Sequence, residues 1–261
     1  MKPLQLKSND TIMLFSPASG AAGVPVLKHR VDNGKVAIEQ MGFKVILGDH
    51  ALIAGERAGS GQERTEDIHT ALKNSEVKAL FSTLGGNHVC AEVLPYLVFE
   101  LIKNNPKIFM GYSDVTSLLL GIYAKTGLTT FYGPAVMTQF GEYPTILPYT
   151  KNSLEKTLLS AEVLGKIEPS SEWTDETLDW AQKLDLTRPR TMTTSKGWEW
   201  LQNGKAQGKL LGGCIQTLVF TLENYPDYIP DFTDTIFFWE SAEKGLSIGH
   251  EPKEVEQDLM K

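Results

Sequence analysis

One serine of the sequence stands between a strongly apolar run and a stretch with helical character, within Phe109–Thr116 (FMGYSDVT). The apolar run predicts a buried strand, which ends in Gly-x-Ser and passes directly into a helix. This layout is typical of a nucleophile elbow, where a tight strand-to-helix turn lifts a serine hydroxyl above the edge of the sheet. The start of the helix would add free backbone N–H groups and a positive dipole end for developing oxyanion charge. The pattern therefore indicates acyl-transfer chemistry at Ser113.

The alternative interpretation of Ser113 is structural. The full Gly-x-Ser-x-Gly pattern is absent, because Val115 occupies the place of the second glycine. Serine is also preferred at helix N-caps, so Ser113 could simply cap the helix expected after it. This short motif alone leaves both interpretations open.

Two further segments end expected strands with residues that suit the same chemistry. Leu84–Asn87 (LGGN) follows one strand, and its glycines would let backbone N–H groups approach a substrate oxygen closely. Glu240 closes the apolar run TIFFWE, where a carboxylate could orient a catalytic base. The structural alternatives are an ordinary strand-to-helix turn for the first segment and a solvated strand end for the second.

The surrounding sequence alternates short apolar runs with amphipathic stretches. Strands are expected at 11–16, 43–47, 77–83, 107–111 and 235–240. Helices are expected at 28–41, 65–73, 89–97, 113–126, 153–159, 175–184 and 251–260, with Thr65 as an N-cap after a glycine-rich loop at 55–62. The alternation indicates an α/β fold with a mainly parallel sheet flanked by helices.

A change of composition after residue 150 divides the chain into three predicted parts. Residues 1–150 are expected to form an N-terminal α/β domain that carries the elbow. Residues 151–204 are polar and charged, and are predicted to be a linker or lid. Residues 205–261 begin with an apolar, glycine-rich run. They are predicted to start a smaller, β-rich α/β C-terminal domain that carries Glu240 and is truncated.

Composition excludes several classes of protein. The 261 residues are 41% hydrophobic with a net charge of −7, which excludes a mainly disordered chain. The chain has 32 acidic and 25 basic residues and no basic stripe, so no nucleic-acid partner is expected. No apolar run approaches the roughly 20 residues that span a bilayer, so no membrane partner is expected either. Cys90 and Cys214 form no Cys-x-x-Cys motif, and a reduced, cytoplasmic protein is predicted.

Several motifs, taken in order, resemble one known family. Residues 105–116 (NPKIFMGYSDVT) and 130–134 (TFYGP) are similar to segments of the LD-carboxypeptidase family of serine peptidases (S66 type). The two glycines at 85–86, GKLLGG at 208–213 and FFWE at 237–240 extend the resemblance over essentially the whole chain. The similarity is closer to the branch of the family that includes the microcin C self-immunity peptidase.

The resemblance implies a Ser-Glu-His triad in that chain order. Ser113 matches the nucleophile, and Glu240 matches the acid that orients the histidine. An unactivated serine is a poor nucleophile and needs a positioned base, and the base needs a third group to fix its tautomer.

The resemblance also implies an oxyanion hole formed by the backbone N–H groups of Gly86 and Asp114. Gly85 and Asn87 would lie on the substrate side of this loop. Asn87-His88 departs from the residues that usually follow the two glycines in the family.

The catalytic base has no match in the chain. In the family the histidine lies well beyond the glutamate, near the end of a longer second domain, whereas here only His250 follows Glu240. His250 matches the start of a helix rather than the histidine-bearing loop, so the triad histidine is expected to be missing from an incomplete chain. The remaining histidines precede the serine and are predicted to be structural or exposed: His29, His50, His69 and His88.

Four tryptophans lie in or near the predicted lid: Trp173, Trp180, Trp198 and Trp200. In the microcin immunity branch a loop tryptophan stacks on the nucleotide base, and Trp180 matches that position. Packing of the lid onto the domain is the alternative, since tryptophan is highly buried on average.

Together these features predict a serine carboxypeptidase or amidase. It would cleave an amide bond in murein peptides, or in peptidyl- or aminoacyl-nucleotides, through an acyl-enzyme. No metal or organic cofactor is needed, and the resemblance implies a homodimer. A catalytically inactive, ligand-binding remnant remains an alternative because of the missing histidine. So does a nucleotide-binding α/β domain that uses the Gly85-Gly86 turn, although it lacks a G-x-G-x-x-G fingerprint and a P-loop lysine.

Overall fold

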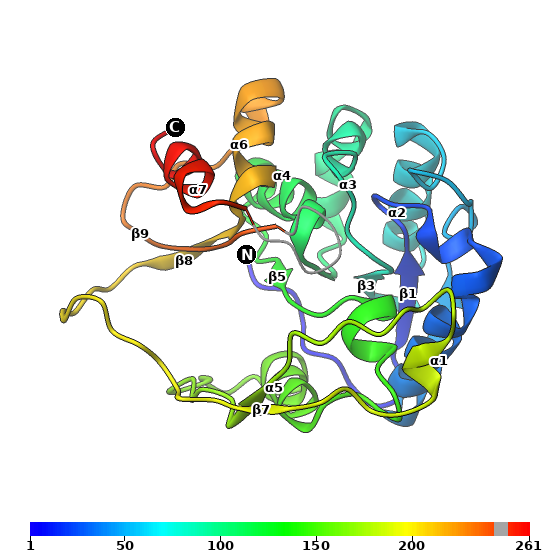
Figure 1. Ribbon diagram of the computed structural model, residues 1–261. Helices are drawn as coiled ribbons and strands as arrows, with labels where there is room; N and C mark the ends of the chain where they lie inside the picture. Colours follow the sequence, from blue (N-terminus) through cyan, green and yellow to red (C-terminus); the bar gives the residue numbers. More distant parts are fainter. Residues whose placement is uncertain (243–249) are drawn as a thin grey trace.

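A parallel five-stranded sheet forms the centre of the protein, in a computed structural model that describes residues 1–242 and 250–261 (Figure 1). The strands are β1 (Thr11–Phe15), β2 (Lys44–Leu47), β3 (Val77–Ser82), β4 (Ile108–Gly111) and β5 (Phe131–Tyr132). Their order is β2-β1-β3-β4-β5, and every adjacent pair is parallel. The predicted α/β fold with a mainly parallel sheet is therefore confirmed.

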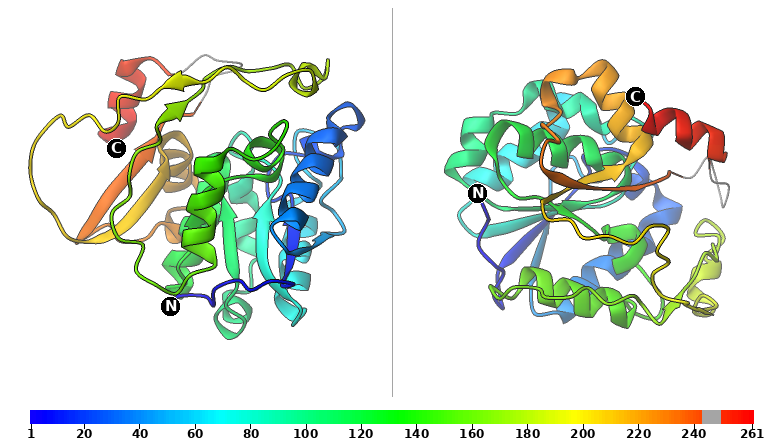
Figure 2. Two further views of the ribbon diagram at one scale, coloured as in Figure 1. Left: turned by 90° about the horizontal axis from the view of Figure 1, so that it is seen from below. Right: turned by 90° about the vertical axis from the view of Figure 1, so that its left-hand side faces the viewer.

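Different helices bury the two faces of the sheet (Figure 2). The register places Met13, Leu80 and Phe109 side by side on one face, while Leu14 and Phe81 point to the other. Parallel strands between two helical layers are apolar throughout, which explains the apolar runs in the sequence. The first layer holds α2 (Gly61–Lys73), α3 (Phe99–Asn104) and α4 (Thr116–Thr126), and the second holds α1 (Lys28–Gln40) and α5 (Pro148–Leu158).

The chain reverses its direction of travel across the sheet next to β1. From β1 it crosses to β2 on one side, and it then returns to β3 on the other side. The loops that follow β1 and β3 therefore start side by side, and the Ser19 N–H donates a hydrogen bond to the Gly85 carbonyl at 3.1 Å. Ligands of open α/β sheets bind at this carboxyl edge, beside such a reversal.

The start of α2 differs from the sequence-based prediction. The helix begins at Gly61 rather than Thr65, because Ser60 and Glu63 form a capping box. The Glu63 N–H donates to Ser60 Oγ at 3.2 Å, and the Ser60 N–H donates to the Glu63 carboxylate at 2.7 Å. The prediction of Thr65 as the N-cap was wrong.

Two other predicted helices also differ. The segment at 175–184 is irregular up to residue 179, and a turn at 180–183 then leads into a 3-10 helix, Leu184–Leu186. The segment at 89–97 is a 3-10 helix over Cys90–Tyr96, with Pro95 inside it. Proline lacks the N–H that a continuing helix would use, which favours such short helical pieces.

A smaller second region packs on α4. β8 (Lys209–Cys214) leads through α6 (Ile215–Asn224) to β9 (Thr235–Glu240), and the two strands pair in parallel. Ser117 of α4 and Thr221 of α6 share a hydrogen bond of 2.9 Å in a buried position. This arrangement fits the predicted smaller C-terminal domain, whose exact boundaries stay a prediction. The last described helix is α7 (Pro252–Leu259).

The connecting segment, which we define as residues 159–208, follows the outside of the molecule between α5 and β8 (Figure 1). Most of its side chains are exposed, and its regular structure includes the short antiparallel pair β6 (Glu172–Trp173) and β7 (Thr193–Thr194). Within the described ranges, no helix has both the length and the apolar content that a membrane crossing needs.

Candidate active site

Ser113 lies in a strained turn at the carboxyl end of β4. Its φ is +59°, in the left-handed region that residues other than glycine rarely adopt. It begins a 3-10 turn, Ser113–Val115, that leads into α4, and neither helix has a side-chain capping hydrogen bond at its start. Such a conformation costs on the order of 1–3 kcal/mol and persists only where its surroundings hold it. The capping role considered for Ser113 has no support in this geometry.

The Gly85-Gly86 turn lies directly against Ser113. A methyl group on Gly85 would come within 3.0 Å of Ser113 Cβ and 3.2 Å of its Oγ. A methyl group on Gly86 would come within 2.8 Å of Asp114 Oδ2. The turns after β3 and β4 therefore meet, and only residues without a side chain fit between them. Gly86 and Asn87 are exposed to solvent beside the half-buried serine.

The side chain of Asp114 holds these two turns together. It is 1% exposed, and its Oδ2 accepts hydrogen bonds from the N–H groups of Val89 (3.0 Å) and Cys90 (2.9 Å). Burial raises the pKa of the Asp114 carboxyl. Among the described residues, no acceptor takes the backbone N–H of Asp114 or of Gly86. These two N–H groups are the ones that the family resemblance assigns to an oxyanion.

Tyr132, at the end of β5, links Ser113 to Glu240. The Ser113 N–H donates to the Tyr132 hydroxyl at 2.9 Å, and this hydroxyl donates to Glu240 Oε1 at 2.5 Å. Burial, followed by the negative charge of Glu240, raises the pKa of the Tyr132 phenol well above its ordinary value. Ser113 and Glu240, which were predicted from separate parts of the sequence, are thus joined through the side chain of Tyr132.

Thr116 holds the backbone carbonyl of Ser113. Its Oγ1 donates to the Ser113 carbonyl at 2.6 Å and accepts from the Cys214 N–H at 3.0 Å. Cys214 is paired in register with Glu240 at the ends of β8 and β9. Neither Thr116 nor Tyr132 was assigned a role from the sequence, although Tyr132 lies in the TFYGP motif that carried part of the resemblance.

The histidines have contacts of other kinds. His29 and His50 lie against the carboxylates of Asp185 and Asp67, at 3.0 Å and 2.9 Å. The remaining three contact a backbone amide, a phenyl ring and a carboxylate: His69 accepts from Val98, His88 stacks on Phe220, and His250 lies 3.6 Å from Glu254. His250 directly precedes the N-cap of α7, as expected for a residue at the start of a helix. In the described part of the chain no cluster of side chains could hold a metal ion.

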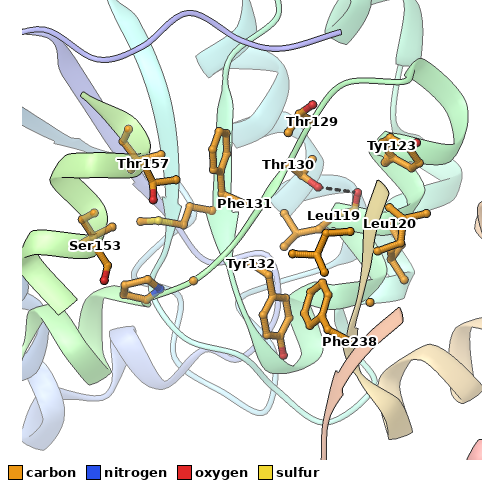
Figure 3. Close-up of a pocket in the computed structure, with 18 of the residues that line it drawn as sticks. Leu119, Leu120, Tyr123, Thr129, Thr130, Phe131, Tyr132, Ser153, Thr157 and Phe238 are labelled. Atoms are coloured by element: carbon orange, nitrogen blue, oxygen red, sulfur yellow. Dashed lines mark hydrogen bonds between the residues drawn. The ribbon is translucent and has the colours of Figure 1, made fainter. Parts of the chain in front are cut away.

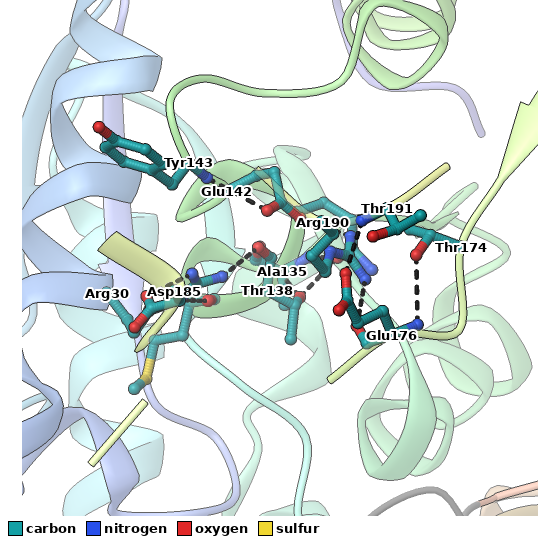
Figure 4. A network of polar contacts seen from close by, with 12 residues as sticks. Arg30, Ala135, Thr138, Glu142, Tyr143, Thr174, Glu176, Asp185, Arg190 and Thr191 are labelled. Carbon is teal, nitrogen blue, oxygen red and sulfur yellow. Dashed lines mark hydrogen bonds and ion pairs between the residues drawn. The ribbon is translucent and has the colours of Figure 1, made fainter. Parts of the chain in front are cut away.

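A buried ion pair holds the connecting segment on α1 (Figure 4). Arg30 Nη1 lies 2.8 Å from Asp185 Oδ2, and both side chains are at least 96% buried. The same guanidinium donates to the carbonyls of Met137 (2.8 Å) and Thr138 (2.9 Å). An arginine carries five donors in a rigid fork, so Arg30 can position the connecting segment and the Met137–Thr138 backbone at the same time.

Trp180 packs on this ion pair. The Arg30 guanidinium carbon lies 4.4 Å from the centroid of the indole ring, a cation–π contact, and the half-buried ring also borders Val31 and Met137. Packing of Trp180 onto the domain is therefore observed, and stacking on a substrate stays a prediction.

Further along the segment, Arg190 pairs with the buried Glu142 (Figure 4). Arg188 pairs with Glu176 at 2.5 Å. Hydrogen bonds from Arg188 and Thr191 lower the pKa of Glu176 to about 2. The Arg190–Glu142 pair gives the exposed segment a second attachment to the domain, and the Arg188–Glu176 pair joins two parts of the segment to each other.

A large cavity lies against the ring of Tyr132 (Figure 3). Its volume is about 990 Å³, and Tyr132 and Phe238 form part of its wall between α4, α5 and β8. Ser113, Glu240 and the two glycines do not line it. The chemistry predicted for Ser113 therefore belongs to the open sheet edge rather than to this cavity.

The fold is that of an α/β protein, and its candidate site, around Ser113, lies at the carboxyl edge of a parallel sheet. Residues 12–133 match the family described as Peptidase S66, the LD-carboxypeptidase N-terminal domain. The microcin C7 self-immunity protein MccF of Escherichia coli is 33% identical over 93% of this chain and 69% of its own length. A Vibrio cholerae protein named as a carboxypeptidase is 36% identical over 82% of this chain, and the chain spans 62% of that relative.

Solved structures similar to this chain are also MccF and MccF-like proteins. An MccF-like protein of Bacillus anthracis has a TM-score of 0.85 at 31% identity, covering 100% of this chain and 75% of its own. A tryptophan-to-phenylalanine variant of MccF with adenosine monophosphate has a TM-score of 0.83 at 31% identity, covering 94% and 72%. MccF has also been solved with aspartyl sulfamoyl adenosine. The chain belongs to the LD-carboxypeptidase family, Peptidase S66.

Proposed function

We propose that the protein is a serine carboxypeptidase or amidase in which Ser113 is the nucleophile. The observation that carries the proposal is the strained backbone of Ser113, which is fixed on both sides while the residue is only half-buried. Strain of this kind is costly, and it occurs preferentially at sites where a side chain must be held in a particular direction. Membership of a peptidase family supports hydrolysis as the reaction.

In the proposed reaction, Ser113 Oγ attacks the carbonyl carbon of an amide and gives its proton to a histidine that Glu240 orients. The negative oxygen of the tetrahedral intermediate would accept hydrogen bonds from the Gly86 and Asp114 N–H groups. The C–N bond then breaks, the amine leaves with the proton, and an ester forms at Ser113. Water hydrolyses this acyl-enzyme by the same steps and releases the acid.

For the substrate we propose an amino acid or peptide joined to a nucleotide, with a murein peptide as the alternative. The adenosine ligands of MccF support the first class, and a Bacillus subtilis relative named as a murein peptide carboxypeptidase, 31% identical, supports the second. Trp180 also favours the nucleotide. With Arg30 against one face of the indole, the ring is held in a fixed position, and a base could stack on it. Stacking of a base on an aromatic side chain contributes about 1–3 kcal/mol.

Hydrolysis assays on the full-length protein test both the proposed reaction and the proposed substrate class. Aspartyl sulfamoyl adenosine and a murein tetrapeptide are incubated with wild-type protein and with Trp180→Ala, and the products are separated by chromatography. We expect release of aspartate from the first compound, and a rise in its KM of roughly 5- to 150-fold in the variant. Trp200→Ala is the matched control, because this exposed tryptophan lies in the same segment.

An unchanged KM in Trp180→Ala would remove the nucleotide-stacking role and leave the hydrolase. Cleavage of the murein peptide alone would support the alternative substrate. Binding of adenosine monophosphate without hydrolysis of either compound would instead indicate the ligand-binding remnant.

A further inference from the structure

Tyr132 connects Ser113, on the central sheet, directly to the side chain of Glu240 on β9. It ends β5, at the edge of the central sheet, and its ring packs edge-on against Phe238 of β9 with the centroids 5.5 Å apart. On the other side, Tyr112 packs edge-on at 6.4 Å. Aromatic pairs prefer this edge-to-face arrangement, so the two neighbours fix the orientation of the ring. The position of the hydroxyl is therefore set by packing and does not depend on its hydrogen bonds alone.

The direction of both hydrogen bonds at this hydroxyl follows from chemistry. A backbone N–H can only donate, so the phenol oxygen accepts from Ser113. The single phenol proton is then directed to the carboxylate of Glu240. The raised pKa of Tyr132 keeps this proton on the phenol at all ordinary pH values. The link between Ser113 and Glu240 is thus a relay of two polarised hydrogen bonds with one defined orientation.

This relay has consequences at each end. At Ser113, the Tyr132 hydroxyl accepts from the backbone N–H of the strained residue, and Thr116 Oγ1 donates to its backbone carbonyl. At Glu240, the same hydroxyl fixes one oxygen of an exposed carboxylate. A carboxylate offers about four acceptor positions, so a carboxylate held by Tyr132 can still accept from a histidine.

We infer that Tyr132 is a positioning residue of the catalytic centre, which holds the Ser113 backbone in its strained conformation and fixes the orientation of Glu240. The inference rests on the proposed function, because it matters only if Ser113 and Glu240 take part in catalysis. Tyr132 itself does not touch the reacting atoms. Its effect on the reaction passes through the two residues to which it is hydrogen-bonded.

Tyr132→Phe in the full-length protein is the direct test, since it removes the hydroxyl and keeps the packed ring. We expect kcat to fall about 10- to 100-fold while KM changes less than about twofold, because only the geometry of the reacting groups is altered. Tyr123→Phe on α4 is the matched control, and it should leave both constants unchanged.

The pH profile separates positioning from a general loss of structure. A hydrogen bond from the phenol stabilises the negative charge of the Glu240 carboxylate. Without that bond, the carboxylate accepts more strongly from the catalytic histidine, and this raises the pKa of the histidine. The acidic limb of the kcat/KM profile should therefore move to higher pH in Tyr132→Phe. In a Glu240→Ala background the same tyrosine substitution should lower kcat much less, because one of its two targets is gone.

A Tyr132→Phe variant with wild-type kcat and an unshifted pH profile would overturn the inference. If that variant does not fold, 3-fluorotyrosine at position 132 keeps the ring and changes only the acidity of the phenol. An identical pH profile in the fluorinated protein would then count against the inference, and a shifted one would support it. The proposed function fails separately, if Ser113→Ala retains normal turnover.

Discussion

The turn that carries Ser113 and the connecting segment are held in place by different kinds of interaction. The turn is surrounded by buried groups: Asp114 and Thr116 are 1% and 0% exposed, and hydrogen bonds fix the Ser113 peptide groups on both sides. The connecting segment, residues 159–208, is mostly exposed and is held by a few ion pairs such as Arg30–Asp185. The first arrangement suits groups that must be positioned to a fraction of an ångström. The second attaches an exposed segment to the domain at a few points only.

This difference predicts that substitutions in the two regions will affect different kinetic constants. Changes at the Ser113 turn should lower kcat, because they move the reacting groups. Changes in the connecting segment should raise KM, because they alter how the segment meets a substrate.

The largest effect short of removing the serine is expected for Gly85→Ala. The new methyl group would lie 3.0 Å from Ser113 Cβ, so either the serine or the loop must shift by a few tenths of an ångström. We expect kcat to fall about 10- to 100-fold with a small change in melting temperature. Steady-state kinetics and differential scanning calorimetry measure the two quantities.

Gly204→Ala is the control for this substitution, because a methyl group there meets no atom within 4 Å. It should leave kcat unchanged. A Gly85→Ala enzyme with normal kcat would show that the two turns do not need their close contact.

A medium effect, on proteolysis and on KM, is expected for Asp185→Ala. The substitution leaves the buried Arg30 without its carboxylate, and breaking a buried pair in this way costs about 3–5 kcal/mol. Because the ion pair attaches the connecting segment to α1, trypsin should cut faster at Lys183 and Arg190. The KM for a nucleotide substrate should rise several-fold, and kcat should change less than about threefold.

Asp32→Ala provides the comparison, since its ion pair with Lys28 is exposed and an exposed pair contributes at most about 1 kcal/mol. It should alter neither proteolysis nor KM. A fall in kcat at constant KM in Asp185→Ala would contradict the separation of the two regions.

The smallest effect is expected for Arg188→Gln, which removes an exposed partner of Glu176. The pKa of Glu176 is lowered to about 2 by hydrogen bonds from Arg188 and Thr191, so their stabilising contribution is present above pH 4.5 and is lost as the pH falls toward 2. In the variant this pKa should move up toward its usual value, which carbon-13 NMR of the glutamate carboxyls can follow. Tryptic cleavage at pH 7 should change less than about twofold. A large change would show that an exposed pair within the segment also fixes its conformation.

Much of the site could be predicted because its parts end apolar runs. Ser113 and Gly85-Gly86 follow neighbouring parallel strands, and the carboxyl ends of such strands meet at one edge. The contact of Tyr132 with Glu240 could not be predicted, because the two residues are 108 positions apart and belong to separate sheets. No local pattern couples them.

The connecting segment shows where sequence patterns fail. A helix was expected at 175–184, yet residues 175–179 have no regular structure and residues 180–183 form a turn. Its conformation depends on Asp185, a single acidic residue that pairs with Arg30 on a helix 155 positions earlier. Neither residue stands out in a polar sequence, since only burial distinguishes this pair from an ordinary surface pair. The α2 capping box was missed for a simpler reason: Ser60 lies inside a glycine-rich loop and appeared to belong to it.

The central claim is that Ser113 is the nucleophile, and covalent labelling of the full-length protein tests it most directly. The protein is treated with a fluorophosphonate, and the modified residue is identified by mass spectrometry of its peptides, alongside turnover measurements on Ser113→Ala. The account predicts one adduct, on Ser113, and a loss of turnover of at least about a thousandfold in the variant. Labelling at another residue, or normal turnover by Ser113→Ala, would contradict it.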